Sequence, residues 1–282
     1  VKNINLILNE LNIITNSGIF YCNRLVDYLN IKNGVLRISL MHYNSFDEVN
    51  KIIETLNYFK KYNINFQFKY DSSYKGFVTE NLKNAFSNLE VDKNYENKRT
   101  RAYSLLDIEN IDNIKIIGDL QFYQSANYNN VNGDILRTYK NIDSKILDDD
   151  CFKHFINTFL TTINKELTKN SIIEKIKFIQ IHQIRVYADN EEEVNLVPEG
   201  IHQDGYNFIA MCCVSRKNVS GAISHIYDES KNIVHSLQLQ EGEMLVLNDN
   251  KMFHNVSPIQ LNKTGKKVKT GYRDVLIFTS IS

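Results

Sequence analysis

The sequence PEGIHQDGYNFIAMCCVSR, from Pro198 to Arg216, places a histidine and an aspartate directly before an apolar, strand-like run. In an extended chain, residues two apart point to the same side, so His202 and Asp204 would project together from one segment. They could form a pair of metal ligands, or they could be solvated residues of a polar turn. This stretch alone leaves both interpretations open, and the rest of the chain has to decide between them.

The sequence on both sides of this stretch, from Phe178 to the end of the chain, consists of short β-like runs separated by turn-like segments. Few helices intervene, which is typical of a sandwich or barrel. The sequence therefore predicts an α+β fold whose C-terminal part is a two-sheet barrel. The expected strands are FIQIHQIRVYA (178–188), NFIAMCCVSR (207–216), AISHIYD (222–228), IVHSLQLQ (233–240), EMLVLN (243–248) and YRDVLIFTSI (272–281).

The first half of the chain has a different pattern, in which apolar residues often recur at helical spacing. Apolar residues recur at helical spacing in 44–61 and again over 144–176, so both segments are expected to contain helices. The run VLRISLMHY at 35–43 is expected to be a strand. The strongly polar segment VDKNYENKRTR at 91–101 is the best candidate for a domain boundary or an exposed connection.

A third metal ligand would have to come from a distant strand that folds back beside His202 and Asp204. His254 is the natural candidate, because it lies 50 positions after Asp204 in EMLVLNDNKMFHNVSPI, where one expected strand ends and another begins. Two histidines and one carboxylate on one face of a metal leave coordination positions open, as in non-haem Fe(II) oxygenases. The spacing therefore favours an iron site over a polar turn.

An organic acid that chelates such a metal needs a cation for its far carboxylate, and Arg273 could supply it. Arg273 follows His254 by 19 positions and begins the last expected strand. The planar guanidinium can donate two charge-assisted hydrogen bonds to a carboxylate at once. The alternative is that Arg273 pairs with its neighbour Asp274.

These residues lie within blocks that resemble the Fe(II)/2-oxoglutarate dioxygenases that hydroxylate free amino acids, of the isoleucine hydroxylase type. The resemblance is carried by PEGIHQDGYNFIAMCCVSRKNVSGAISHIYD, LVLNDNKMFHNVSPI and YRDVLIFT, and upstream by GDLQFYQSANYNNVNGDILRTYKNI at 118–142. It covers about residues 93–282. It implies a double-stranded β-helix, a jelly-roll barrel, as the fold of that region.

The resemblance also implies the roles of the matching residues: His202, Asp204 and His254 as iron ligands, and Arg273 as the anchor of the 2-oxoglutarate co-substrate. Such enzymes use Fe(II), 2-oxoglutarate and O₂, with ascorbate as a possible support of activity. They hydroxylate an aliphatic carbon and release succinate and CO₂. Because Asp204 is present, there is no vacant iron position for chloride, and hydroxylation is favoured over halogenation. The alternatives are a non-catalytic jelly-roll binding module and a dioxygenase acting on a peptide- or carrier-bound substrate.

An amino-acid substrate needs a cation for its carboxylate and acceptors for its ammonium group. The candidate substrate residues are Arg137, Gln124, Gln183, Arg185 and Arg216, and for each the alternative is a surface or supporting role. Gln183 and Arg185 alternate with apolar residues on an expected strand, so their face is expected to line the cavity. The histidines His182, His225 and His235 are expected to be packed or surface residues, and Cys212 and Cys213 to be buried and without thiol chemistry.

The first 62 residues lie outside this pattern, and SGIFYCNRLVDYLNIKNGVLRISLMHYNSFDEVNKIIETLNYF resembles the C-terminal end of a PLP-dependent cysteine desulfurase or fold-type I aminotransferase. Arg37 matches an arginine that holds the substrate carboxylate there, and Cys22 lies near that family's cysteine, one residue out of register. The catalytic lysine is absent, so PLP chemistry is not expected. The expected domains are a small α/β segment (1–62), a connection (63–92) and the dioxygenase domain (93–282). Val1 in place of methionine is compatible with truncation of a longer chain or with an alternative start codon.

Charge and cysteine usage limit the classes of partner. Lysines plus arginines number 33, as do aspartates plus glutamates, so no excess positive charge favours nucleic acid or an anionic membrane. The four cysteines have no CxxC spacing, which is typical of a reducing compartment, and the cytoplasm is the expected location. The expected partners are a small amino-acid substrate and, as possibilities, a second copy of the chain or a PLP-dependent enzyme.

Overall fold

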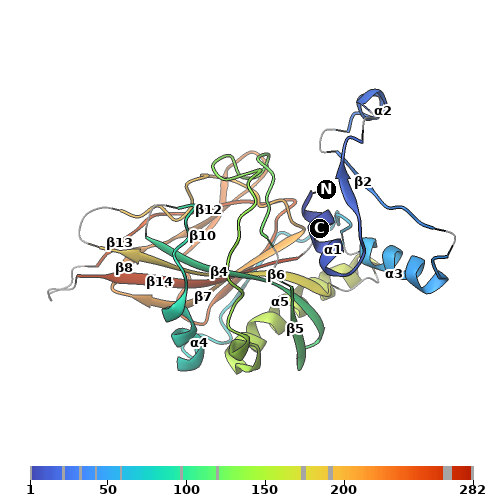
Figure 1. Cartoon of the computed structure of the whole chain (residues 1–282). Coiled ribbons are helices and arrows are strands. Elements are labelled where there is room, and N and C mark those ends of the chain that lie inside the picture. Colours follow the sequence, from blue (N-terminus) through green and yellow to red (C-terminus); the bar gives the residue numbers. More distant parts are fainter. Residues whose placement is uncertain are drawn as a thin grey trace.

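A seven-stranded antiparallel sheet dominates the structure, a computed structural model that describes residues 2–20, 23–31, 34–41, 43–57, 59–95, 98–118, 121–172, 176–189, 193–262 and 269–280. Figure 1 shows this sheet as the long central layer. Its strands, in spatial order, are β3 (Phe68–Asp71), β11 (Met244–Asn248), β7 (Phe208–Lys217), β14 (Gly271–Ser280), β6 (Phe178–Ala188), β4 (Arg99–Asn110) and β5 (Asn113–Ile117).

Two smaller sheets pack against one face of this main sheet. They are formed by β10 (Ile233–Leu237), β9 (Ser224–Tyr227) and β12 (Phe253–Val256), and by β13 (Ile259–Leu261) with β8 (Val219–Gly221). The layers share apolar cores: Ile184 and Val275 of the main sheet pack with Val256 and Ile259 of the small sheets. The result is the two-layered, mostly antiparallel architecture expected of a jelly roll, so the predicted fold class is confirmed.

Helices cover the other face of the main sheet. The helix α5 (Asp150–Lys169) follows the 3₁₀ turn η2 (Ser144–Asp148), and the short α4 (Glu80–Asn84) continues into η1 (Ala85–Asn88). The apolar face of α5 is buried, and the rings of Phe152 and Phe159 lie 6.2 and 5.9 Å from that of Phe278 on β14. At the start of α5, Asp149 accepts hydrogen bonds from the free amides of the first turn.

The strands expected between 178 and 281 are all found, with their ends shifted by at most a few residues. The polar segment 91–101 differs from its expectation, because Arg99 and Arg101 are buried in β4. The guanidinium of Arg99 lies 3.9 Å from the centre of the Tyr95 ring, and Arg101 lies 3.7 Å from Asp92. Aromatic and carboxylate neighbours thus allow these arginines to enter the core.

The N-terminal region contains α1 (Lys2–Glu10), β1 (Asn16–Gly18), α2 (Asn23–Tyr28), β2 (Val35–Arg37) and α3 (Phe46–Asn57), drawn in blue in Figure 1. The predicted helix at α3 is found, and Ser45 and Glu48 exchange hydrogen bonds at its start as a capping box. Of the predicted strand 35–43, only three residues form β2. The apolar face of α3 stays partly exposed, with 54% of the Ile53 surface accessible.

The N-terminal region contacts the barrel through α1 and through the chain after α3. Ile7 of α1 is buried in a cluster with Tyr103 of β4 and Phe122, and Tyr62 and Ile64 belong to the main core. The domain limits 1–62, 63–92 and 93–282 and the resemblance of residues 1–62 to a PLP-dependent enzyme stay predictions. Cys22 lies outside the described residues, and the guanidinium of Arg37 lies 4.5 Å from the Phe20 ring centre. No helix in the described part of the chain combines the length and the apolar character needed to cross a membrane.

Candidate active site

The three predicted metal ligands converge on one point between the two layers. His202 lies in the loop before β7 and pairs through its backbone with His254 of β12, so the two rings lie 4.3 Å apart. The Asp204 carboxylate lies between them, with its oxygens 3.6 Å from His202 Nε2 and 3.5 Å from His254 Nε2. One ligand atom from each residue lies within 4.8 Å of the others, which is close enough to bind a single ion.

The hydrogen bonds around His202 prepare its ring for a metal. Its Nδ1 lies 2.9 Å from the carbonyl oxygen of Gly200, which orients the ring and assigns the proton to Nδ1. Nε2, on the side of Asp204, is then the nitrogen that can donate its lone pair to a cation. Metal-ligating histidines usually donate their second ring N–H to a backbone carbonyl or a carboxylate in this way.

The electrostatics of the three side chains favour a positive charge among them. Burial disfavours the charged form of His202, but the Asp204 carboxylate, 3.6 Å from Nε2, outweighs this and raises the pKa of His202 to about 9. Burial likewise disfavours the charged form of Asp204, but the two histidines hold its pKa well below the usual value. The donor set therefore suits a divalent cation with nitrogen and oxygen ligands.

Two residues hold the loop that carries Asp204. The buried carboxylate of Asp249 accepts hydrogen bonds from the backbone N–H groups of Asp204, Gly205 and Tyr206, at 3.1, 2.7 and 3.0 Å. From the other side, Gln124 Nε2 donates to Oδ1 of Asp204 and to its carbonyl oxygen, both at 3.1 Å. Both the loop and the ligand carboxylate are thereby fixed.

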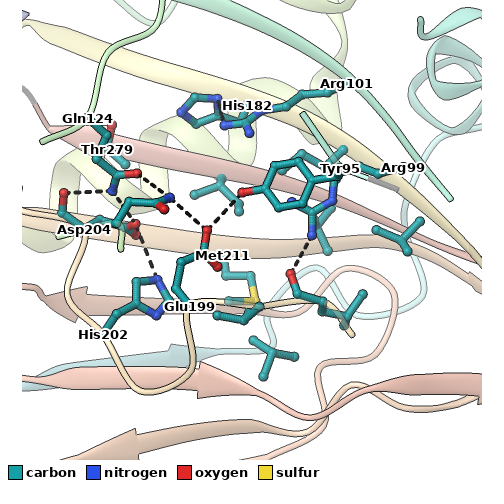
Figure 2. A pocket seen from close by; sticks show the side chains of 18 of the residues that line it. Tyr95, Arg99, Arg101, Gln124, His182, Glu199, His202, Asp204, Met211 and Thr279 are labelled. Carbon is teal, nitrogen blue, oxygen red and sulfur yellow. Dashed lines mark hydrogen bonds and ion pairs between the residues drawn. The ribbon is translucent and has the colours of Figure 1, made fainter. Parts of the chain in front are cut away.

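A chain of polar side chains continues from Gln124 along the cavity wall (Figure 2). Asn129 donates to Gln124 Oε1 at 3.1 Å and to Glu199 Oε1 at 2.8 Å. The hydroxyl of Tyr95 donates to the same Glu199 oxygen at 3.0 Å. Glu199 is thus connected through two amide side chains to the Asp204 carboxylate.

The three ligands line a cavity of about 130 Å³ between the layers. Arginines dominate the charged part of its lining: Arg99, Arg101, Arg137 and Arg273. The acidic residues among the described lining residues are Asp204 and Glu199. Such a cavity favours ligands that carry carboxylate groups.

Arg273 begins β14 and points into this cavity, where it is only 4% exposed. Its Nη2 lies 3.4 Å from the sulfur of Met211, and its Nε has no hydrogen-bond partner among the described residues. Burial lowers the pKa of Arg273 to about 10, which still leaves the guanidinium charged near neutral pH. Asp274 points to the opposite face of the sheet and binds Arg185 instead, at 2.6 and 2.8 Å, so the alternative pairing of Arg273 with Asp274 is not found.

Of the five candidate substrate residues, two line the cavity and three do not. Gln124 and Arg137 line the cavity, and Arg137 lies 4.5 Å from the Phe122 ring centre with Nε and Nη2 unpartnered among the described residues. Arg216 does not line it and donates to the Gly221 carbonyl oxygen at 2.8 Å.

The expectation that Gln183 and Arg185 line the cavity is wrong. The opposite face of β6, carrying His182, Ile184 and Val186, lines it instead. The alternation along β6 was correctly predicted, but the strand is buried on both faces, so polarity does not tell which face meets the cavity. Arg185 is satisfied on the helix-covered face by its ion pair with Asp274.

Of the three histidines expected to be packed or exposed, one lines the cavity and two lie away from it. His182 is buried, as expected, but it lines the cavity, where its Nδ1 lies 2.7 Å from an Arg101 nitrogen. Burial and then the charge of Arg101 hold its pKa well below the usual value, so His182 is neutral and accepts from Arg101. His225 bonds to Ser236, and His235 stacks on Phe68, both away from the cavity.

Cys212 and Cys213 are fully buried, in agreement with the prediction. Burial raises the pKa of Cys213 to about 11 and that of Cys212 well above its usual value. Neither thiol is thus activated as a nucleophile.

Several residues of the site escaped the sequence reasoning: Asp249, Glu199, Asn129, Tyr95 and Arg101. Glu199 and Asp249 lie in the same short motifs as the ligands, which was the available signal. Asn129 lies in the block 118–142 that carries the resemblance, but no pattern of its own marks it. Nothing local marks Tyr95 or Arg101, which come from the polar segment 91–101, whose last residues form the start of β4.

Comparison with known proteins relates this site to a family. Residues 83–279 match the family model described as 2OG-Fe dioxygenase. The sequence matches no curated protein. Among solved structures, the chain is similar to a bsmA homolog from Methylobium petroleophilum PM1, with a TM-score of 0.61 and 18% identity over 76% of this chain and 87% of that chain. It is also similar to IDO from Bacillus thuringiensis, with a TM-score of 0.57 and 22% identity over 76% of this chain and 92% of that chain. These identities bear on the fold alone.

Proposed function

Because the chain belongs to the 2OG-Fe dioxygenase family, we propose that it hydroxylates an aliphatic carbon of a free L-amino acid, or a close derivative, with release of succinate and CO₂. The family consists of oxidoreductases that use Fe(II), 2-oxoglutarate and O₂. The observation that carries the proposal is that His202, Asp204, His254 and Arg273 line one cavity. A module that only binds a ligand would not need all four.

In this proposal, His202, Asp204 and His254 would hold the iron. Two imidazole nitrogens and one carboxylate suit Fe(II), and neighbouring residues hold these ligands in place. When bound, Fe(II) and 2-oxoglutarate would allow O₂ to oxidise a C–H bond of the substrate. The chain's own residues set the geometry: the Gly200 carbonyl orients the ring of His202, and Gln124 and Asp249 hold Asp204 and its loop. The Asp204 carboxylate in the ligand set favours hydroxylation over halogenation.

Arg273 is the proposed anchor for the far carboxylate of 2-oxoglutarate. Its guanidinium is buried, and Asp274 does not compete for it because Arg185 binds that carboxylate. A carboxylate binds more strongly to a buried arginine beside a thioether sulfur than to an exposed arginine, because water does not screen the buried ion pair.

Arg137 is the proposed partner of the substrate carboxylate. It is 2% exposed, lines the same cavity and has two guanidinium nitrogens without a partner among the described residues. An unpartnered buried donor is costly unless a ligand satisfies it. Gln124, whose amide nitrogen already binds Asp204, is better suited to support the metal ligand than to bind the substrate.

The lining of the cavity supports a small substrate. Arg137 and Arg273 line the same cavity between the layers and offer one cation each to a substrate and a co-substrate carboxylate, whereas a long open groove would be expected for a peptide. A peptide- or carrier-bound substrate and a non-catalytic binding module remain the alternative functions that the experiment below separates.

We also propose a cytoplasmic location, supported by the cysteines. Cys151, Cys212 and Cys213 are free thiols in the structure, as is usual in a reducing compartment. Self-association and association with a PLP-dependent enzyme stay predictions, as does the support of activity by ascorbate.

The experiment is succinate formation by the purified protein with Fe(II), 2-oxoglutarate, O₂ and ascorbate across the twenty common L-amino acids, with mass spectrometry for the gain of one oxygen. The control is Asp204→Ala. Substrate-dependent succinate with a hydroxylated product, both lost in Asp204→Ala, is the expected result. Substrate-independent succinate that requires Asp204 would point to a substrate outside the panel. No succinate under any condition would favour the binding module.

A further inference from the structure

Glu199 is the carboxylate in the cavity that the proposed iron site does not use. Among the described lining residues, four are arginines and two are acidic, and Asp204 is one of the three predicted iron ligands. A zwitterionic substrate that enters this cavity brings a carboxylate, which the arginines can bind, and an ammonium group, which they repel. Glu199 is then the counter-charge that remains for the ammonium group.

The hydrogen bonds of Glu199 leave part of its carboxylate available. Tyr95 and Asn129 both donate to Oε1, at 3.0 and 2.8 Å. In the part of the chain that the structure describes, Oε2 accepts no hydrogen bond, and the side chain is only partly buried. One oxygen thus fixes the position of the group while the other can receive a donor from a ligand.

The position of Glu199 relative to the metal ligands is fixed by the same contacts. It precedes His202 by three residues in the loop that enters β7, and Asn129 and Gln124 connect it to the Asp204 carboxylate. Figure 2 shows this connected row of side chains along one wall of the cavity. A substrate held at Glu199 would therefore be held at a defined place relative to the iron ligands.

We propose that Glu199 binds the protonated amino group of the substrate and so restricts the site to substrates with a free, protonated amino group. This inference rests on the proposed function, in which Arg137 takes the substrate carboxylate. The ammonium group donates to Glu199 Oε2 in a charge-assisted hydrogen bond. An N-acylated amino acid, or a residue inside a peptide, has no positive charge to offer there and cannot donate this charge-assisted hydrogen bond.

The informative variant is Glu199→Gln, which removes the charge and keeps most of the structure. The amide oxygen of glutamine can still accept from Tyr95 and Asn129, so the row of hydrogen bonds to Asp204 is preserved. Glu193→Gln is the matched control, because Glu193 lies exposed in the same loop and does not line the cavity. Circular dichroism and thermal melting of both variants check that the fold is intact.

The test is a calorimetric titration of the twenty common L-amino acids and their N-acetyl derivatives into protein that contains Ni(II) and 2-oxoglutarate, so that binding is read without turnover. We expect the wild type to bind a free amino acid and to bind its N-acetyl derivative at least about tenfold more weakly. Glu199→Gln should weaken binding of the free form by about 10- to 100-fold, the value of one charge-assisted hydrogen bond, and should abolish the difference between the two forms. Glu193→Gln should behave as the wild type.

Two results would overturn the inference in distinguishable ways. If Glu199→Gln binds the free amino acid as tightly as the wild type, Glu199 is not the ammonium site, and the proposed hydroxylase function is unaffected. If no free amino acid binds to the wild type, the substrate class itself is wrong and the role of Glu199 fails with it. Succinate formed without a substrate, and lost in Asp204→Ala, would in that case still identify a working dioxygenase site.

Discussion

His202 and His254 exchange both of their main-chain hydrogen bonds, at 3.1 and 2.9 Å, although 52 positions separate them in the sequence. Residues paired in this way across two strands have side chains on the same side, so the two imidazoles meet without a special turn. Asp204, two residues after His202, then completes the triangle. The predicted metal site is thus a property of strand pairing, with the supporting contacts added around it.

Arg273→Lys should raise the KM for 2-oxoglutarate by about 10- to 100-fold and leave the iron affinity unchanged. Lysine keeps the charge but loses the planar pair of donors that a carboxylate fits. The measurement is succinate formation against 2-oxoglutarate concentration. Arg185→Lys is the control, since Arg185 lies on the other face of the sheet, and an unchanged KM in Arg273→Lys would contradict the proposed anchor.

Gln124→Met should weaken Fe(II) binding by about tenfold, because the variant removes the donor that holds the Asp204 carboxylate while keeping a similar volume. The KM for the substrate, measured at saturating iron, should change far less. Iron titration followed by the absorbance of the iron and 2-oxoglutarate complex measures the first quantity. A large rise in the KM for the substrate with normal iron affinity would instead show that Gln124 binds the substrate.

Asp249→Ala should lower the affinity for iron by about 10- to 100-fold, although Asp249 is not itself one of the three predicted ligands. Three backbone N–H groups around Asp204 lose their acceptor, and the loop that positions this ligand is released. Asp249→Asn, which keeps one acceptor oxygen, should lose less. Glu229→Ala, at an exposed turn, is the control and should bind iron as the wild type does.

Asp274→Ala should destabilise the protein by about 3–5 kcal/mol, because it leaves the buried guanidinium of Arg185 without its partner. Urea unfolding measures the change. Replacing both residues, as in Arg185→Met with Asp274→Ala, should recover part of the loss, since no unpaired charge remains. The KM for 2-oxoglutarate of the folded Asp274→Ala variant should stay near the wild-type value, and a large rise would show that Asp274 supports Arg273.

The neutral state of His182 should make stability depend on pH below about 6.5. The pKa of His182 is lowered in the folded protein, so the unfolded chain binds the extra proton and the folded one does not. The contribution of neutral His182 to the free energy of unfolding is therefore complete above the unfolded pKa. It falls as the pH drops below that pKa, by at most about 1.4 kcal/mol per pH unit. Comparing urea unfolding at pH 7.5 and 5.5, His182→Gln should lose less stability than the wild type, and equal losses would contradict the assignment.

The local pattern was enough to predict most of the barrel and to single out the three residues, His202, Asp204 and His254, that the structure brings together. Runs such as 178–188 and 272–281 are strand-like over their whole length, and they form β6 and β14. His202 and Asp204 share a face because they are two residues apart, and that spacing is a local property. The N-terminal run 35–43 was less predictable, since only three of its described residues find a strand partner.

The residue types of the predicted iron site, and the order of short strands that brings them together, were determined by the sequence alone, because strand periodicity and the choice of ligand residues are visible in short segments. The tertiary structure decided which side of each strand meets the cavity. β6 is buried on both faces, so only its pairing with β14 shows that Arg185 turns to Asp274 while His182 lines the site. It also decided the support of the site, because Asp249, Gln124 and Glu199 take their partners from segments far away in the chain, and such contacts follow from packing that no local pattern contains.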